Sequence, residues 1–204
     1  MTVYTPKELA IFLDSCKKHG NMKIETHFRV LSYTGARKSE ILVLEWTDIN
    51  FESKKLTISK TLAEIESDPN TKTTTVACQS AKTNTANRTI SIDSETMRML
   101  EEWRIRQQFK FTIIGFKAAN IHQIIFPNKF NRFCHPGQVN DLYDMIFTKY
   151  KLNKQITFTK FSKNDVSLCT MTDMNLEVIM YRVGHKDSKL TRLVYNCFYP
   201  ERKE

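Results

Sequence analysis

Residues 34–42 of this 204-residue chain read TGARKSEIL, and they connect two stretches of helical spacing. The first stretch is expected over about residues 25–33. After the quoted segment an apolar face resumes at Ile41 and Leu42. The spacing therefore predicts that Arg37 lies near the start of a helix.

An earlier helix is marked at both of its ends. Thr5 stands at the N-cap, Pro6 at the first helical position and Glu8 three residues after the cap, which is a capping-box pattern. The apolar face of this helix comprises Leu9, Phe12, Leu13 and Cys16. Gly20 is expected to end it. The chain should therefore begin with two helices in succession.

After residue 50 the apolar period changes from helical to alternating. Residues 55–59 and 88–92 alternate as strands do, with a long polar stretch rich in Thr, Lys, Asn and Ser between them. A short apolar run occupies 124–127, and helical spacing covers 95–108, 138–150, 164–172 and 176–183. We predict an α+β fold, mostly α-helical, with a small antiparallel β-sheet inserted after the first two helices.

The charge balance of the chain is basic. There are 31 Lys and Arg residues against 22 Asp and Glu residues, which gives a formal charge of +9 and a pI of about 9.3. This excess favours an anionic partner such as nucleic acid or a membrane surface, although a basic soluble protein without such a partner has the same composition.

The sequence contains no long apolar run and no signal at its start that would indicate a membrane span or secretion. We therefore expect one domain in the cytoplasm. The five cysteines are scattered, odd in number and never spaced as C-x-x-C, which argues against a disulfide framework and against a zinc ribbon. They are expected to be reduced thiols.

Several short motifs occur together in a fixed order. TGARKSE at 34–40 resembles a T-G-x-R-x-x-E box, and residues 80–90 resemble a β-hairpin that carries a catalytic lysine ahead of an R-x-I strand. Residues 183–187 resemble an L-G-H-x-D box, and Tyr195 stands ten residues after His185. With further matches at 44–50 and 125–127, the chain is similar to the catalytic domain of the tyrosine recombinases, the DNA-cutting and rejoining integrases of phages and other mobile elements.

The resemblance implies a catalytic set of four residues. Tyr195 would attack a DNA phosphodiester and form a covalent 3'-phosphotyrosyl link. Arg37 would bind the non-bridging oxygens with its guanidinium fork. Lys82 would donate a proton to the leaving 5'-oxygen, and His185 would hydrogen-bond the phosphate or help activate the nucleophile. The resemblance implies no cofactor and no metal.

Each of these residues also has a structural alternative. Arg37 could be a solvated helix residue, His185 could cap a helix, Tyr195 could pack its ring in the core, and Lys82 could be one more solvated loop lysine. The motifs favour the catalytic interpretation because they occur jointly and in register.

The second box of the family, H-x-x-R, is degenerate in this chain. Thr159 stands at the histidine and Ser162 at the arginine, 23 residues before His185. A serine hydroxyl supplies neither the charge nor the fork of an arginine, so we expect impaired chemistry; compensation by Lys160 or Lys163 is the alternative. Asn164 and Asp165 follow where the family usually carries histidine and threonine, and a carboxylate near a phosphate site is electrostatically unfavourable.

At the level of the whole chain, the resemblance implies a catalytic domain over residues 1–204, with the N-terminal core-binding and arm-binding domains of the family absent. The expected partner is double-stranded DNA, on which family members act as tetramers that exchange a C-terminal segment. Two other hypotheses remain: a non-catalytic DNA-binding protein that keeps the basic face, and an inert remnant of a decaying element.

Overall fold

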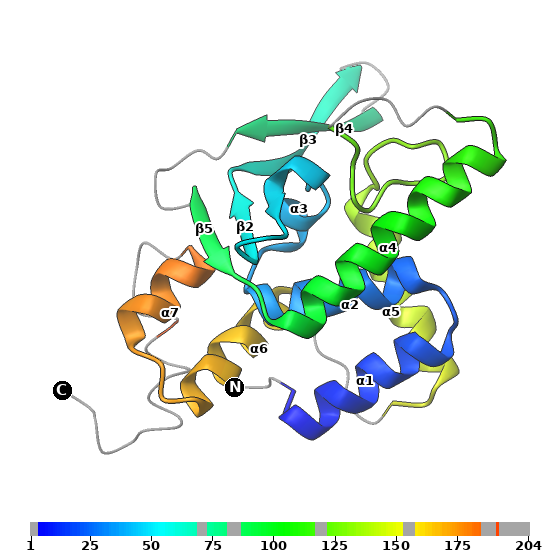
Figure 1. Ribbon diagram of the computed structural model, residues 1–204. Helices are drawn as coiled ribbons and strands as arrows, with labels where there is room; N and C mark the ends of the chain where they lie inside the picture. Colours follow the sequence, from blue (N-terminus) through cyan, green and yellow to red (C-terminus); the bar gives the residue numbers. More distant parts are fainter. Residues whose placement is uncertain are drawn as a thin grey trace.

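The computed structural model of the chain describes residues 4–68, 73–80, 87–116, 122–152, 158–184 and 191. Figure 1 shows helices grouped around a small sheet, with a long hairpin extending beyond it. The helices are α1 (Pro6–Lys18), α2 (Met22–Thr34), α3 (Lys38–Ile41), the 3₁₀ turn η1 (Trp46–Asp48), α4 (Ser94–Ile113), α5 (Pro136–Lys149), α6 (Phe158–Met171) and α7 (Leu176–Val183). The strands are β1 (Ile49–Asn50), β2 (Lys55–Ile58), β3 (Lys60–Asp68), β4 (Thr73–Ser80) and β5 (Arg88–Ser91).

The first two helices form as the sequence predicts. The Thr5 hydroxyl accepts a hydrogen bond from the Glu8 amide, and the Glu8 carboxylate accepts one from the Thr5 amide at 2.7 Å, so two otherwise unpaired backbone donors are satisfied. α2 begins a few residues earlier than expected because the Asn21 side chain caps it, accepting from the Lys23 amide at 3.1 Å. α2 then packs against α1, α4 and α6 (Figure 1).

The sheet contains both predicted strands. β1, β2 and β5 form an antiparallel sheet in which Leu56 lies opposite both Ile49 and Ile90, with all three side chains buried. The sequence predicts no strand in the polar stretch between β2 and β5. Instead, β3 and β4 pair only with each other among the described residues, as a separate antiparallel hairpin. Lys60 anchors the start of that hairpin through ion pairs with Glu45 and Asp48.

Other element boundaries also differ from the sequence prediction. α4 runs on to Ile113, and α6 begins at Phe158, six residues earlier than expected. The apolar positions after residue 41 do not continue a helix. Instead, α3 ends at Ile41 and the backbone crosses to a distant segment, where the Ile125 amide donates to the Leu44 carbonyl at 2.8 Å. Over a run of only a few residues, the apolar pattern of a buried extended segment cannot be told from that of a helix.

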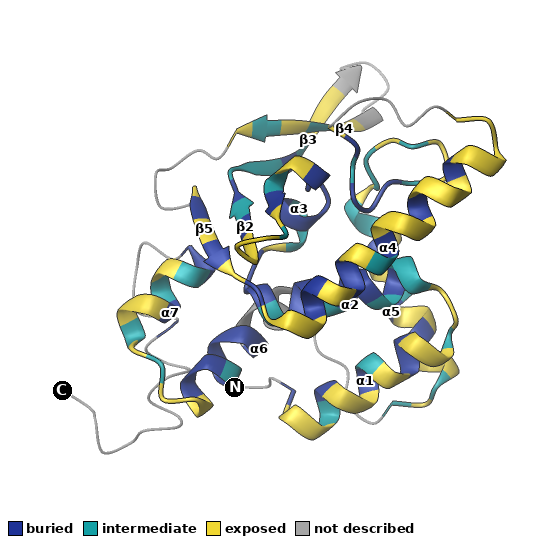
Figure 2. Cartoon of the chain, in the orientation of Figure 1, coloured by how far each residue is buried: buried dark blue, intermediate teal, exposed yellow. Residues whose placement is uncertain are grey.

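Most buried apolar residues belong to one core cluster, and Figure 2 shows the buried positions along α2, which contributes several of them. Phe12 and Phe28 are almost fully buried there and meet edge to face, and burying each ring contributes about 1.5–3 kcal/mol. A second, smaller cluster joins α6 to α7 through Val166, Cys169, Ile179 and Val183. These two helices therefore form a unit that docks on α2 and on β5.

The structure also bears on two expectations from composition. The four cysteines that it describes, Cys16, Cys78, Cys134 and Cys169, form no disulfide. Among the described helices, none is both long enough and apolar enough to cross a membrane.

Candidate functional site

Arg37 is the predicted catalytic residue whose surroundings the structure describes. It follows the left-handed turn at Gly35 that ends α2, and it caps the start of α3, as expected. Its Nη1 donates to Glu40 Oε1 at 2.8 Å, and its Nη2 donates to the carbonyl oxygen of Gly184 at 3.2 Å. These bonds use one hydrogen on each Nη, and the side chain is 46% exposed. The guanidinium is therefore oriented by the fold while part of it faces solvent.

Behind Arg37 lies a buried ion pair between Glu40 and Arg88. The Arg88 Nη2 donates to Glu40 Oε2 at 2.9 Å, and its Nη1 donates to Oε1 at 3.2 Å. The Arg88 side chain is 0% exposed, and that of Glu40 is 4% exposed. One carboxylate thus faces two guanidinium groups. The cluster of these three side chains keeps a net positive charge, and Arg37 is its solvent-facing member.

Gly35 brings three distant segments together. A Cβ atom at this position would lie 2.7 Å from Cγ1 of Val183 on α7 and 2.8 Å from Oδ2 of Asp165 on α6. The backbone φ of +63° is also one that a side chain disfavours. The glycine of the T-G-x-R segment is therefore required by close packing as well as by the turn.

Asp165, the carboxylate that is unfavourable near a phosphate site, is paired with an arginine in the structure. It is buried, and its Oδ2 accepts a hydrogen bond from Arg182 Nε at 2.8 Å. Burial raises the pKa of Asp165, and the Arg182 charge opposes that rise. The neighbouring Asn164 is buried too, and its side-chain oxygen accepts from the Tyr4 amide at 3.0 Å. Both side chains are thus buried on α6 with hydrogen-bond partners.

The other predicted site residues are only partly placed. Thr159 and Ser162 lie in the first turns of α6, as part of its backbone. Lys82, His185 and Tyr195 lie outside the described residues. Gly184, whose carbonyl binds Arg37, directly precedes His185, so the first box and the start of the L-G-H-x-D segment meet in space although nearly 150 residues separate them.

Glu40 and Arg88 are members of the quoted motifs without a role of their own in the predicted catalytic set, and Arg182 belongs to no motif. Glu40 had one local signal, because a carboxylate three residues after Arg37 can reach back to it on the first turn of a helix. No sequence spacing indicates that Arg88 and Arg182 join the same network. These contacts depend on how β5 and α7 dock.

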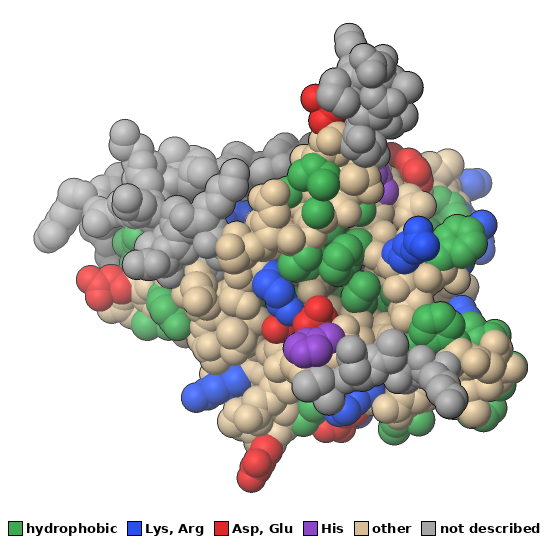
Figure 3. Space-filling model, turned by 90° about the horizontal axis from the view of Figure 1, so that it is seen from above, with side chains coloured by type: hydrophobic (Ala, Val, Ile, Leu, Met, Phe, Trp, Pro, Cys, Tyr) green, Lys and Arg blue, Asp and Glu red, His purple; other side chains and the backbone are tan. Residues whose placement is uncertain are grey.

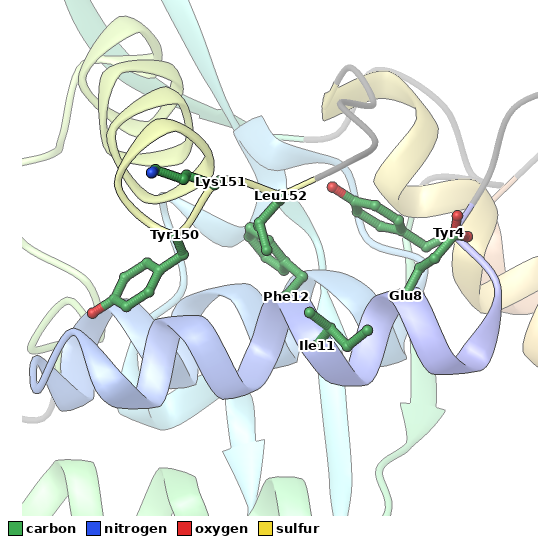
Figure 4. Close-up of a pocket in the computed structure, with 7 residues that line it drawn as sticks. All are labelled: Tyr4, Glu8, Ile11, Phe12, Tyr150, Lys151 and Leu152. Atoms are coloured by element: carbon green, nitrogen blue, oxygen red, sulfur yellow. The ribbon is translucent and has the colours of Figure 1, made fainter.

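The described residues also form a pocket away from Arg37. An open pocket between α1 and the end of α5 is lined mostly by apolar groups, with Phe12 and Leu152 at its centre (Figure 4), and none of its lining residues belongs to the motifs. On the face seen in Figure 3, Lys and Arg side chains are scattered rather than gathered into one patch. Within the described residues, no group of three or more His, Cys, Asp or Glu side chains could hold a metal ion.

Comparison with known proteins extends the motif resemblance to the whole chain. Residues 2–201 match the Phage integrase family. A "Tyrosine recombinase XerC-like" protein of Caldanaerobacter subterraneus subsp. tengcongensis is 24% identical over 98% of this chain and 51% of its own length. The ICEBs1 integrase of Bacillus subtilis is 23% identical over 100% of this chain and 52% of its own length. The chain thus spans about half the length of these curated relatives.

Solved structures share the same fold. XerA recombinase matches with a TM-score of 0.74 at 11% identity, over 100% of this chain and 66% of that one. The Tn1549 transposon integrase in complex with transposon right end DNA matches with a TM-score of 0.74 at 17% identity, over 95% of this chain and 61% of that one. The prediction of a mostly helical domain with a small inserted sheet is therefore confirmed. By its sequence match over nearly all of its length, the chain belongs to the phage integrase family of tyrosine recombinases.

Proposed function

We propose that this chain cuts and rejoins duplex DNA at a specific site, as the catalytic part of an integrase from a phage or another mobile element. The observation that carries the proposal is the placement of Arg37, whose half-exposed guanidinium is held between Glu40 and the Gly184 carbonyl. An always-charged fork held in this way suits a phosphodiester, because it can bind two oxygens without reorganising.

In the proposed reaction the phenol oxygen of Tyr195 attacks the phosphorus of a DNA phosphodiester. A bond from this oxygen to phosphorus forms, and the bond from phosphorus to the 5'-oxygen breaks. Lys82 gives the leaving 5'-oxygen a proton, and His185 hydrogen-bonds the phosphate or helps to activate the phenol. Attack by another 5'-hydroxyl on the phosphotyrosyl link reverses these steps and rejoins DNA, so the energy of the broken bond is retained.

The degenerate second box sets the expected rate. Ser162 stands where the family carries its second phosphate-binding arginine, and Thr159 stands at the histidine. Loss of one such donor costs on the order of a hundred- to a thousandfold in rate. We therefore propose that the cleavage step is slow in this chain rather than changed in kind.

Double-stranded DNA is the proposed partner, and the formal charge of +9 supports this choice. The Tn1549 integrase, which shares the fold, has been solved in complex with transposon right end DNA. We further propose that the chain acts in the cytoplasm, and as a tetramer on DNA that exchanges C-terminal segments.

A second candidate function is DNA binding without cleavage. The observation that favours it is the pair of substitutions at Thr159 and Ser162. A protein of this kind would bind duplex DNA with a strong dependence on salt, and its affinity would not change in a Tyr195→Phe variant.

Trapping on a nicked suicide duplex, in which the fragment after the cut diffuses away, separates the two functions. We expect a slowly formed covalent adduct that disappears in Tyr195→Phe and forms about a hundred- to a thousandfold faster in Ser162→Arg. Lys163→Arg, one position along α6, is the matched control and should not accelerate it. Salt-dependent binding without an adduct in either the wild type or Ser162→Arg would establish the non-catalytic function instead.

A further inference from the structure

Arg182 occupies a position in the fold that neither the motifs nor the catalytic set explains. It lies on α7, two residues before Gly184, and its side chain is only 16% exposed. Its Nε donates to Asp165 on α6, its Nη1 donates to the Ser91 carbonyl at the end of β5, and its Nη2 donates to the Tyr33 carbonyl near the end of α2. One side chain therefore joins α7 to three other elements.

Those three contacts fall next to the segments that carry the candidate site. Tyr33 immediately precedes the T-G-x-R segment. Asp165 lies three residues after Ser162, so the two positions share a face of α6. The carbonyl oxygen of Arg182 itself accepts from Arg88 Nε at 2.7 Å. Arg88 binds Glu40, and Glu40 binds Arg37.

Arg182 is thus linked to Arg37 indirectly, through three sets of contacts. Through its side chain it holds the end of α2, from which the turn to Arg37 departs. Through its carbonyl it orients the buried pair of Arg88 and Glu40. Through the end of α7 it places the Gly184 carbonyl, which is a direct partner of Arg37. We infer that Arg182 is a positioning residue, which sets the geometry of the Arg37 guanidinium and of the helical turn that carries Ser162.

A simpler role for Arg182 would be to neutralise the buried Asp165. The number and direction of its bonds argue for more than that. A guanidinium directs donors along fixed, diverging lines, and here three of them reach acceptors on three separate elements. A lysine ammonium keeps the charge but gathers its donors at one point, so it can satisfy Asp165 and still lose the carbonyls of Ser91 and Tyr33. Arg182→Lys therefore separates positioning from neutralisation.

Arg29 offers a matched control. It too is a mostly buried arginine, with a side chain 19% exposed, that joins two elements through Asp93 and Thr96. Its hydrogen bonds link α2 to the start of α4, and its guanidinium stacks on the Tyr33 ring at 4.4 Å, but it donates neither to the Tyr33 carbonyl nor to Glu40. Arg29→Lys should therefore cost a comparable amount of packing without moving Arg37.

The direct test is the side-chain NMR spectrum of ¹⁵N-labelled full chain, with the Arg37 Nε–H signal assigned through Arg37→Lys. We expect this signal to shift in Arg182→Lys and to keep its wild-type position in Arg29→Lys. In the neutral double variant Asp165→Asn/Arg182→Gln the signal should also stay displaced. An unshifted Arg37 signal in Arg182→Lys, or a wild-type signal in the double variant, would overturn the inference.

The second readout rests on the proposed cleavage activity. At saturating nicked duplex, Arg182→Lys should form the Tyr195 adduct about ten- to a hundredfold more slowly, with duplex Kd unchanged, because small misplacements of a reacting group cost that much. Arg29→Lys should cleave at the wild-type rate. An unaffected rate in Arg182→Lys would overturn the inference. If the wild-type chain forms no adduct, the proposed function fails, and the Arg37 signal alone decides whether Arg182 positions it.

Discussion

Replacing Glu40 by glutamine should destabilise the fold far more than the loss of an ordinary ion pair. Glu40 accepts from two guanidinium groups, and its pair with Arg88 is buried on both sides, with side-chain exposures of 4% and 0%. Removing one partner of a buried pair costs about 3–5 kcal/mol, because the remaining charge stays desolvated. The half-exposed contact with Arg37 adds little, since solvent screens it.

The glutamine keeps one oxygen as an acceptor, so the lower end of that range applies, and we expect a loss of about 3 kcal/mol in the free energy of unfolding. Urea unfolding followed by circular dichroism at neutral pH measures it. The matched control is Glu95→Gln, which removes an exposed pair with Arg98 on α4 and should cost at most about 1 kcal/mol.

A double variant tests whether the two side chains act together. If the buried pair is the source of the effect, Glu40→Gln and Arg88→Gln combined should cost clearly less than the sum of the two single changes. Loss of about 0.5 kcal/mol or less in Glu40→Gln, or simple additivity with Arg88→Gln, would refute the reasoning from burial.

Two further predictions concern stability. Gly35→Ala should lower the free energy of unfolding, measured in urea, by about 2–5 kcal/mol, because of the positive φ and the crowding against α6 and α7. The control is Gly20→Ala, which has nothing within 4 Å of the new methyl group and should lower it by only about 1–2 kcal/mol. Equal losses in the two variants would contradict the role of packing at Gly35. Burial, together with nearby lysines, lowers the pKa of His27 to about 3. Because that value lies below the unfolded value of about 6.5, stability should be full above pH 6.5 and fall by up to about 1.4 kcal/mol per unit as the pH drops towards 3. When stability is measured as a function of pH, His27→Leu should reduce its loss at acid pH. Replacement of the exposed His122 by glutamine should leave this loss unchanged. The same loss in His27→Leu as in the wild type would exclude His27 as its cause.

Local signals in the sequence predicted the elements whose ends are fixed by neighbouring residues. The capping box at Thr5 marks the start of α1 through contacts within a few residues, and α7 spans the predicted residues 176–183 and ends at the left-handed Gly184. The start of α6 was missed because residues 158–163 show no clear apolar period, so the docking of this helix on α2 is not visible in the spacing.

In the candidate site, too, only features carried by neighbouring residues could be predicted from the sequence. Arg37 is predicted as a candidate because its motif is continuous in sequence, and its catalytic role stays a prediction. The network behind it could not, because Arg88 comes from a strand and Arg182 from a helix far along the chain, and only the docking of β5 and α7 brings them to Glu40. The replacement at Asp165 appeared unfavourable from the sequence for the same reason, since its counter-charge lies 17 residues away.

The close contact at Gly35 has a consequence for the order of folding. This contact joins residue 35 to residues 165 and 183, so it closes a loop that includes most of the chain. Contacts of such long range form late, because the entropy of loop closure must be overcome before they contribute stability. A nascent or partly unfolded chain would therefore hold Arg37 apart from the L-G-H-x-D segment. The proposed reactivity towards DNA would therefore arise only after this long-range contact has formed.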